Sequence, residues 1–419
     1  MRVNIYSAIL FLLVSNHFAF AQSEVLFPFF IDQVSIPLIA AGHTGTANLT
    51  TDAIGFYYNP AQLGYSSRYN NFAFSFMPSK TNLPAFLPIT TRSYGFQVGY
   101  DFNKIDKSIP LTIGVGFIHS YLNYGKFTFT NSQSPSPLIE YEPEDSYNSI
   151  SLGAGYKYFA YFNLGFSLKM FNSFLTKQIT SNGIKDVKAD GTSIDLGALV
   201  ILPLSELWFN KTIFNNNGYS IKPKSNFSIG YAINNIGEKV YFIDPAQSDP
   251  LPRIARLGYN LNFGLDIQIK NVELNLIDYS FTGEADDILV KRDTTGVKYE
   301  GMFGKLIPGK HLISLVSDKN VVVHKAHTFS LFETITYSTG RVNGRQYQII
   351  KTEGVGISTE GLLKLLCAFT ENKVLNYITG HFTLEYSRAN LNSAVYQNIL
   401  PSNNRKYESI SLYIKNFEF

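Results

Sequence analysis

Few residues in this 419-residue chain stand at spacings that could support catalysis or metal binding. His324 and His327, in "VHKAH", could hold a metal only on a helix or with further ligands nearby, and no cysteine or acidic residue stands beside them. We interpret them as a surface pair. The stretch "GKLIPGKH", Gly304 to His311, has the spacing of a phosphate loop, but His311 replaces the required serine or threonine. We interpret this stretch as a loop.

Enzyme signatures are missing elsewhere too. The sequence contains no G-x-S-x-G and no H-E-x-x-H, although a serine and a histidine on adjacent strands could still form a lipase-like pair. The only cysteine, Cys367 in "GLLKLLCAF", has apolar neighbours and is expected to be a buried, inert thiol. We therefore expect a protein that is not an enzyme, with no catalytic residue, no cofactor and no bound metal.

The charge content limits the classes of partner. The net charge is only +3 and no basic block is present, so we expect no nucleic-acid partner. Charged residues make up 16% of the chain, against about 25% in ordinary soluble domains, while aromatic residues make up 15%. Something other than charge must cover part of the surface.

The N-terminus reads as a secretory signal peptide. Arg2 precedes an apolar run from Ile5 to Val14, and Ala19-Phe20-Ala21 forms a small-residue cleavage site before Gln22. The run is too short for a membrane-spanning helix, which needs roughly twenty apolar residues. We predict that residues 1–21 are removed and that the mature chain is exported.

Most of the remaining chain alternates with period two, which places alternate side chains on opposite faces of a strand. In "RLGYNLNFGLDIQIK" every second residue from Leu257 to Ile269 is apolar, and the intervening ones are polar or glycine. The same alternation occurs in "YGFQVGYDF", "ISLGAGYKY" and "FNLGFSLKM". Each strand is thus expected to have one apolar face and one polar, glycine-rich face.

Two architectures can cover such apolar faces. A soluble sandwich or propeller turns them toward a protein core, whereas an outer-membrane barrel turns them toward lipid and keeps the polar face in its lumen. Runs of about nine to fourteen residues match strands that cross a bilayer at a tilt. Aromatic residues at the ends of the apolar rows, such as Tyr94 and Phe102, or Tyr156 and Tyr158, match interfacial girdles.

We therefore predict an all-β fold, a transmembrane antiparallel barrel of about 14 strands over residues 70–419, located in the bacterial outer membrane. A soluble or surface-attached structural β-domain is the other class. The chain ends in the strand "ISLYIKNFEF", and its terminal Phe419 resembles the signal that the barrel-insertion machinery reads. The apolar alternation changes phase between Ile414 and Phe417, which implies a bulge or weakens this signal. Four long polar stretches are expected to be extracellular loops: 130–147, 210–226, 237–252 and 283–309.

Several charged residues share the parity of the predicted lumen face. They could line a polar route or anchor another segment by ion pairs, or a wet interior could simply tolerate them. These residues are Asp101, Lys157, Lys169, Asp266 and Glu385.

The segment before the first strand differs from the rest. In "YYNPAQLGY", Asn59 suits a helix N-cap, Pro60 the first helical position, and Gly64 the left-handed residue that ends a helix. Asp52 could cap a second turn from Ala53 to Phe56. We predict that residues 22–69 form a small helical plug inside the barrel, whose lumen fourteen strands leave too wide for side chains to fill.

The stretch "AAGHTGTANLTTDAIGFYYNPAQLG" resembles the N-terminal signature of the PorV/PorQ family, which is itself similar to the fatty-acid transporter FadL. The matching positions are Gly42, Gly45, Asp52, Ala53, Asn59, Pro60, Ala61 and Leu63. A second likeness lies near the C-terminus, where Thr352, Gly354 and Gly356 fit a Thr-x-Gly-x-Gly strand. The stretch "HTFSLFETI" and the phase of the final strand depart from the family pattern.

The resemblance implies two roles. PorV-like proteins act in type IX secretion, where they bind exported cargo and hand it on, so secretion-system proteins and cargo would be partners. FadL-like proteins carry long-chain fatty acids or other hydrophobic compounds past a mobile plug. In both cases the barrel contacts outer-membrane lipid and the plug would gate the lumen. The plug residues implied are Asp52, Tyr57, Tyr58, Asn59, Pro60, Ala61 and Leu63.

Overall fold

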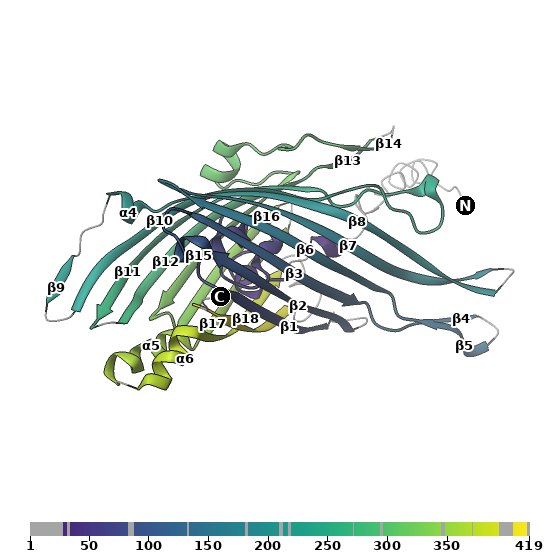
Figure 1. Ribbon diagram of the computed structural model, residues 1–419. Helices are drawn as coiled ribbons and strands as arrows, with labels where there is room; N and C mark the ends of the chain where they lie inside the picture. The colour runs from purple at the N-terminus through teal and green to yellow at the C-terminus, as the bar shows by residue number, and fades with distance from the viewer. Residues whose placement is uncertain are drawn as a thin grey trace, which may run out of the picture.

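Fourteen long strands form one closed antiparallel sheet in the part of the chain that is described (Figure 1). The computed structural model describes residues 28–31, 34–82, 88–131, 134–180, 183–208, 213–216, 219–270, 272–293, 296–344, 348–370, 372–393 and 405–416. The predicted signal peptide and the final Phe417 and Phe419 lie outside these ranges.

The barrel strands follow one another in chain order around the wall. They are β1 Phe72–Asn82, β2 Pro88–Asp101, β3 Leu111–Asn123, β6 Glu144–Lys157, β7 Tyr161–Thr180, β8 Gly183–Leu202, β10 Tyr219–Gly237, β11 Ile254–Ile269, β12 Val272–Ile288, β15 Val321–Leu331, β16 Ile335–Gly344, β17 Gln348–Ser358, β18 Phe382–Ser393 and β19 Arg405–Ile414. The first and last pair directly, with Phe72 opposite Ile414, so the sheet has no open edge.

Alternation along each strand sorts the side chains as predicted. In β7, Leu164 and Phe166 are 68% and 42% exposed on the outside, whereas Ser167, between the outward side chains, is 2% exposed. Phe263 of β11 is 49% exposed, also on the outside. An apolar outer surface and a polar interior are the pattern of a transmembrane barrel, so the predicted fold class is confirmed and a sandwich or propeller is excluded.

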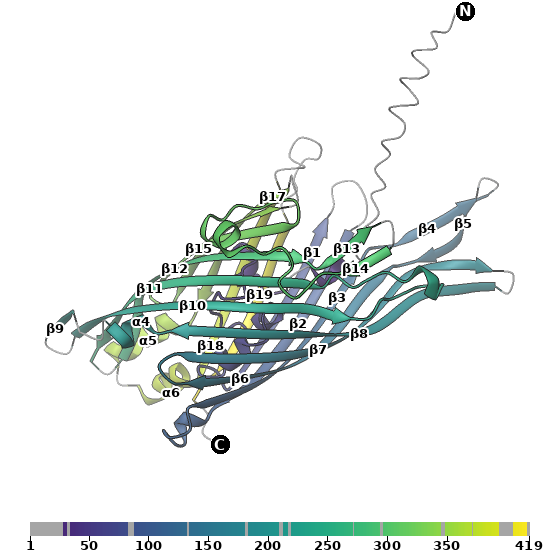
Figure 2. The ribbon, with the colours of Figure 1, turned by 90° about the horizontal axis from the view of Figure 1, so that it is seen from above.

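The two ends of the barrel differ, and we name them by their contents. The terminal end is where β1 begins and β19 ends, and it also carries β9 Phe214–Asn216 and α4 Leu204–Trp208. The loop end carries the hairpins β4 Phe127–Asn131 with β5 Ser134–Tyr141, and β13 Val290–Asp293 with β14 Gly296–Tyr299. Figures 1 and 2 show β9 and the β4–β5 hairpin at opposite ends of the molecule.

Three of the four expected extracellular stretches overlap connections at the loop end, namely 124–143, 238–253 and 289–320. The fourth prediction is wrong. Residues 203–218 connect β8 to β10 at the terminal end, and residues from Tyr219 onward already belong to β10. The lysines and serines of 219–226 made this half of β10 look like a loop, although in a barrel polar residues are normal on the inner face.

Short helical elements complete the fold. Before β1 lie η1 Pro28–Phe30, α2 Ile36–Ala40, η2 Gly55–Tyr57 and α3 Gln62–Ser66. Single turns η3 Phe102–Lys104, η4 Pro245–Gln247 and η5 Pro308–Ile313 lie in connections, and α5 Glu360–Phe369 with α6 Lys373–His381 join β17 to β18. None of the helices within the described ranges is long and apolar enough to cross a membrane.

Candidate functional site

The described residues between Pro28 and Asn71, which we call the plug, pack inside the barrel. An apolar cluster near the loop end joins plug and wall: Phe30 packs edge-on against Phe171 with ring centroids 5.2 Å apart, and Tyr57 stacks on Tyr147 at 5.6 Å. The hydroxyl of Tyr57 donates to the carbonyl of Phe30 at 2.8 Å. The lumen is therefore filled at this level by side chains from both parts.

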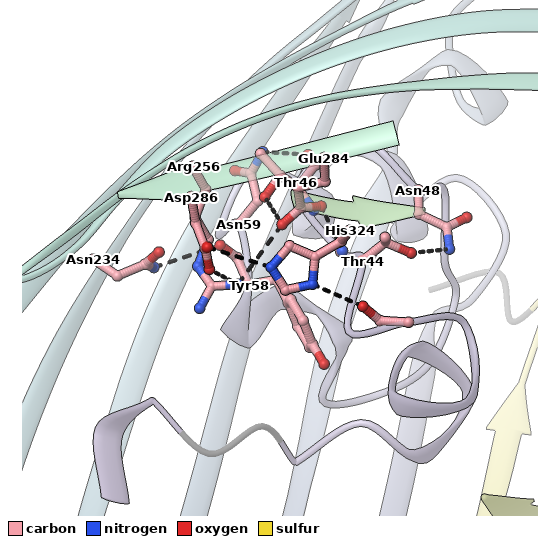
Figure 3. A network of polar contacts seen from close by, with 12 residues as sticks. Thr44, Thr46, Asn48, Tyr58, Asn59, Asn234, Arg256, Glu284, Asp286 and His324 are labelled. Atoms are coloured by element: carbon pink, nitrogen blue, oxygen red, sulfur yellow. Dashed lines mark hydrogen bonds and ion pairs between the residues drawn. The ribbon is translucent and has the colours of Figure 1, made fainter. Parts of the chain in front are cut away.

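Glu284 of β12 binds one stretch of the plug backbone (Figure 3). Its Oε2 accepts hydrogen bonds from the amides of Gly45 and Thr46, both at 2.9 Å, and its Oε1 accepts from the Thr46 hydroxyl at 2.7 Å. Glu284 is fully buried. A carboxylate that accepts two adjacent backbone N–H groups forms strong, charge-assisted bonds, so this contact fixes both the position and the orientation of the plug backbone.

Further charges surround Glu284 (Figure 3). Arg256 Nη1 lies 3.7 Å from Glu284 Oε1 and 3.9 Å from Asp286 Oδ2, and its guanidinium carbon lies 5.6 Å from the centre of the Tyr58 ring. His324 pairs with Asp286 at 3.3 Å and is 2.8 Å from the Gly42 carbonyl through Nδ1. The buried charges are thus paired with one another and with the plug, as their removal from water requires.

Asp52 anchors the plug where the barrel closes. Its carboxylate accepts hydrogen bonds from Ser35 at 2.5 Å and from Ser75 of β1 at 2.7 Å, and Ser75 also contacts Ser411 of β19 at 2.5 Å. Burial raises the pKa of Asp52 above its ordinary value, and the hydrogen bonds from the two serines oppose that rise. Asp52 therefore joins two parts of the plug to the first and last strands.

Asn59 satisfies three backbone groups at once. Its amide donates to the carbonyls of Thr46 at 2.8 Å and Ala198 of β8 at 3.0 Å, and its oxygen accepts from the Ala61 amide at 3.0 Å. The two helical turns predicted from the sequence are present, but their ends differ. Helix α3 begins at Gln62, and Gly64 lies inside the helix and not after it.

Glycines of the wall explain how closely the plug approaches. A Cβ atom at Gly197 would lie 1.9 Å from Asn59 Oδ1, and one at Gly165 would lie 2.2 Å from the carbonyl carbon of Pro60. At Gly153 it would lie 2.6 Å from the Cβ of Leu63, which is itself fully buried. The glycine-rich inner face seen in the sequence is therefore a docking surface for the segment from Asn59 to Leu63.

Lys169 is the most enclosed of the charges predicted to face the lumen. It is 1% exposed, and its ammonium lies 2.8 Å from Asp195 of β8 and 2.9 Å from Asn235 Oδ1. The ammonium also lies 4.3 Å from the centre of the Tyr57 ring, a cation–π contact with the plug. The ion pair of Lys169 thus joins two strands of the wall, β7 and β8, and Lys169 reaches the plug only through the Tyr57 ring.

The other four predicted lumen charges lie apart from this pair. Asp101 accepts from the Asn103 amide at the terminal end of β2, and Lys157 pairs with Glu206 at 3.2 Å at the terminal end of β6. Asp266 accepts from Asn275 at 2.7 Å, and Glu385 accepts from Ser387 at 2.9 Å. The five charges therefore form no continuous row.

Two cavities lie on either side of the plug. At the loop end, a cavity of about 430 Å³ is walled mainly by Tyr124, Phe127, Tyr141, Phe174, Leu175 and Phe242. Toward the terminal end, a cavity of about 530 Å³ is lined by plug and wall residues that include Arg68, Lys222, Lys224, Asp266, Asp278 and Glu333. The first is apolar and the second is polar and charged.

Sequence reasoning missed Glu284, Arg256 and Asp195, and it placed His324 wrongly. The two histidines lie in β15, so a spacing of three puts them on opposite faces: His324 is buried in the lumen, and His327 contacts the Tyr279 hydroxyl at 2.9 Å. The signal for Glu284 was available, because "SFTGEADDI" continues the alternation of β12. No group of three or more potential metal ligands occurs in the described ranges.

No family model matches the sequence, and no curated protein matches it. Among solved structures, the chain is similar to the Ralstonia pickettii toluene transporter TbuX, with 10% identity, a TM-score of 0.41, and coverage of 93% of this chain and 100% of that one. It is also similar to the P. putida toluene transporter TodX, with 11% identity, a TM-score of 0.40, and coverage of 92% and 99%. It is similar as well to a Pseudomonas aeruginosa FadL homologue, with 8% identity, a TM-score of 0.39, and coverage of 92% of this chain and 99% of that one.

Proposed function

We propose that this chain is an outer-membrane channel that takes up hydrophobic small molecules past the plug and performs no bond chemistry. The exposed apolar strand faces support insertion in a membrane, and the long connections of the loop end support its facing the outside, with the terminal end in the periplasm. Among the similar solved structures, TbuX and TodX are toluene transporters and a third protein is a FadL homologue.

One observation carries the proposal. Tyr124 and Phe242 line the apolar cavity at the loop end and also pack against the apolar cluster that joins plug and wall. These two residues thus connect the apolar wall of the cavity to the plug, and Asp145 and Ser173 are polar groups of the same wall. The volume of about 430 Å³ lies within the range of small-molecule sites. A hydrophobic compound would enter there, and the polar cavity beneath the plug would be its exit.

Binding of cis-parinaric acid, a fluorescent long-chain fatty acid, tests this function on the purified barrel. Burying a phenylalanine side chain contributes about 1.5–3 kcal/mol, so Phe174→Ala should weaken binding by between about tenfold and a hundredfold. Phe159→Ala, which removes an exposed aromatic side chain at the other end of the barrel, is the matched control and should leave binding unchanged. Failure to bind, or equal affinity in both variants, would refute the proposal.

Type IX secretion is the second candidate, and it rests on the resemblance of the N-terminal stretch to the PorV/PorQ signature. The plug contacts of Asp52 and Asn59 give those residues a structural role that serves either function. Affinity capture from native membranes tests it directly. Recovery of secretion components and of cargo carrying a C-terminal signal domain would favour secretion over uptake.

A further inference from the structure

The hairpin of α5 and α6 exposes an apolar stripe that the barrel does not cover. On α5, Leu362, Leu366 and Phe369 recur at a spacing of three to four residues and are 55%, 53% and 70% exposed. On α6, Val374 and Tyr377 are 67% and 53% exposed. Residues at this spacing share one face of a helix, so each helix presents a row of large apolar side chains.

The opposite face of α5 is tied to the rim of the barrel. Glu360 pairs with Lys415 at 2.5 Å and with Lys364 at 3.0 Å, and Lys364 pairs with Glu333 of the β15–β16 turn at 2.5 Å. The first turn of α5 lies so close to this β15–β16 turn that a Cβ at Gly361 would be 1.5 Å from the Phe332 carbonyl oxygen. These contacts fix the rotation of the helix, so its apolar stripe stays turned away from the rim.

The stripe continues the lipid-facing surface of the wall. The Tyr377 ring lies 6.5 Å from the ring of Phe382, the first residue of β18, and the outward row of that strand proceeds through Leu384, which is 52% exposed. On the other side of the hairpin, Ile357 of β17 is 51% exposed and stands three residues before Glu360. Figure 1 shows both helices beside the ends of β17 and β18, outside the outline of the strands.

We propose that the α5–α6 hairpin is an interfacial anchor that lies in the headgroup region of the leaflet at the terminal end, with its apolar stripe at the acyl boundary. Amphipathic helices bind membranes in this way, with the apolar face about 5–10 Å deep. Tyr377 and Lys373 suit the interface, because tyrosine concentrates there and a lysine stem can lie along apolar surface while its ammonium stays in water. Continuity with the wall favours lipid over a protein partner as the occupant.

Tryptophan fluorescence in phospholipid vesicles tests the anchor. The only native tryptophan, Trp208, is first replaced by phenylalanine, and Phe369→Trp or Tyr377→Trp is then introduced. We expect brominated phosphatidylcholine to quench both reporters as it quenches Phe166→Trp on the wall, and aqueous acrylamide to quench them far less than Tyr241→Trp in the β10–β11 connection. Quenching by acrylamide to the level of Tyr241→Trp would overturn the proposal.

Asn376→Trp is the matched control within the hairpin, because Asn376 is exposed on α6 outside its apolar row. We expect acrylamide to reach this reporter while it spares that of Phe369→Trp. Equal access of acrylamide to both would show a hairpin surrounded by water, and the stripe would then be free for a protein partner. Electrophoretic mobility in SDS that changes on heating checks that each variant is folded. If the Phe369→Trp or Tyr377→Trp variant does not fold, Leu362→Trp takes its place.

Discussion

Replacing Glu284 by alanine should release the plug backbone from the wall. The substitution leaves the amides of Gly45 and Thr46 without the acceptor that each has at 2.9 Å. An unpaired buried N–H costs about 1–3 kcal/mol, and water that enters the vacated space moderates that cost, so we expect a loss of about 3 kcal/mol for the pair. At 1.4 kcal/mol per factor of ten, the population in which this part of the plug is detached rises a little over a hundredfold.

Amide hydrogen exchange measures that population. Exchange at Gly45 and Thr46 should accelerate by the same factor in Glu284→Ala, because these amides exchange when they leave the carboxylate. Glu284→Gln retains an oxygen that can accept from both amides, so it should show much less acceleration. Glu238→Ala removes an exposed carboxylate in the β10–β11 connection and is the control. Unchanged protection in a folded Glu284→Ala barrel would refute the role of this contact.

Three further changes test other parts of the plug. Gly197→Val should displace Asn59, because even the Cβ would lie 1.9 Å from its side-chain oxygen, and we expect larger conductance in planar bilayers. Lys169→Met leaves Asp195 as an unpaired buried charge and should lower the free energy of unfolding in urea by about 3–5 kcal/mol, which Lys169→Met with Asp195→Leu should largely restore. Enclosure in the lumen, reinforced by nearby cations, lowers the pKa of His43 to about 3. The contribution of neutral His43 to the free energy of unfolding is therefore complete above pH 6.5 and falls as the pH drops toward 3. At pH 5 the free energy of unfolding should be lower by up to ~2 kcal/mol, and His43→Gln should abolish this loss.

The alternation of side chains was sufficient to predict the barrel, because lipid outside and polar groups inside impose a strict period of two on strands such as β7 and β11. Asp52 and Asn59 could be singled out because turn-forming residues stand out against that pattern. Their partners could not, since Glu284 contacts residues 238 and 239 positions earlier in the chain. His324 was wrongly predicted to lie on the surface for a related reason. Its segment is a barrel strand, in which a polar residue can face the lumen, and its partners there come from distant parts of the chain.

Helices α5 and α6 were missed for a different reason. "GLLKLLCAF" has leucines on both faces of a helix, and an apolar run of this length is compatible with either a strand or a helix. Its conformation depends on Glu360 and Lys364, whose partners Lys415 and Glu333 come from the ends of other strands. Cys367, expected to be an inert buried thiol, is partly exposed and contacts the Thr379 hydroxyl at 3.2 Å across the two helices.

The distribution of contacts indicates which part of the plug moves when a hydrophobic compound arrives. Such a compound meets the apolar cluster first, and there it exchanges apolar contacts of Phe29 and Phe30 for its own. Displacing these two residues breaks one hydrogen bond, from the Tyr57 hydroxyl to the Phe30 carbonyl, whereas displacing the other segment breaks the several bonds of Asp52, Asn59 or Glu284. We therefore expect η1 to be displaced before the segment from Asn59 to Leu63, which the signature alone would make the gate. Cis-parinaric acid should then accelerate amide exchange at Phe29 and Phe30 and leave Ala61 protected. Acceleration at Ala61 with no change at Phe30 would show instead that the hydrogen-bonded segment opens first.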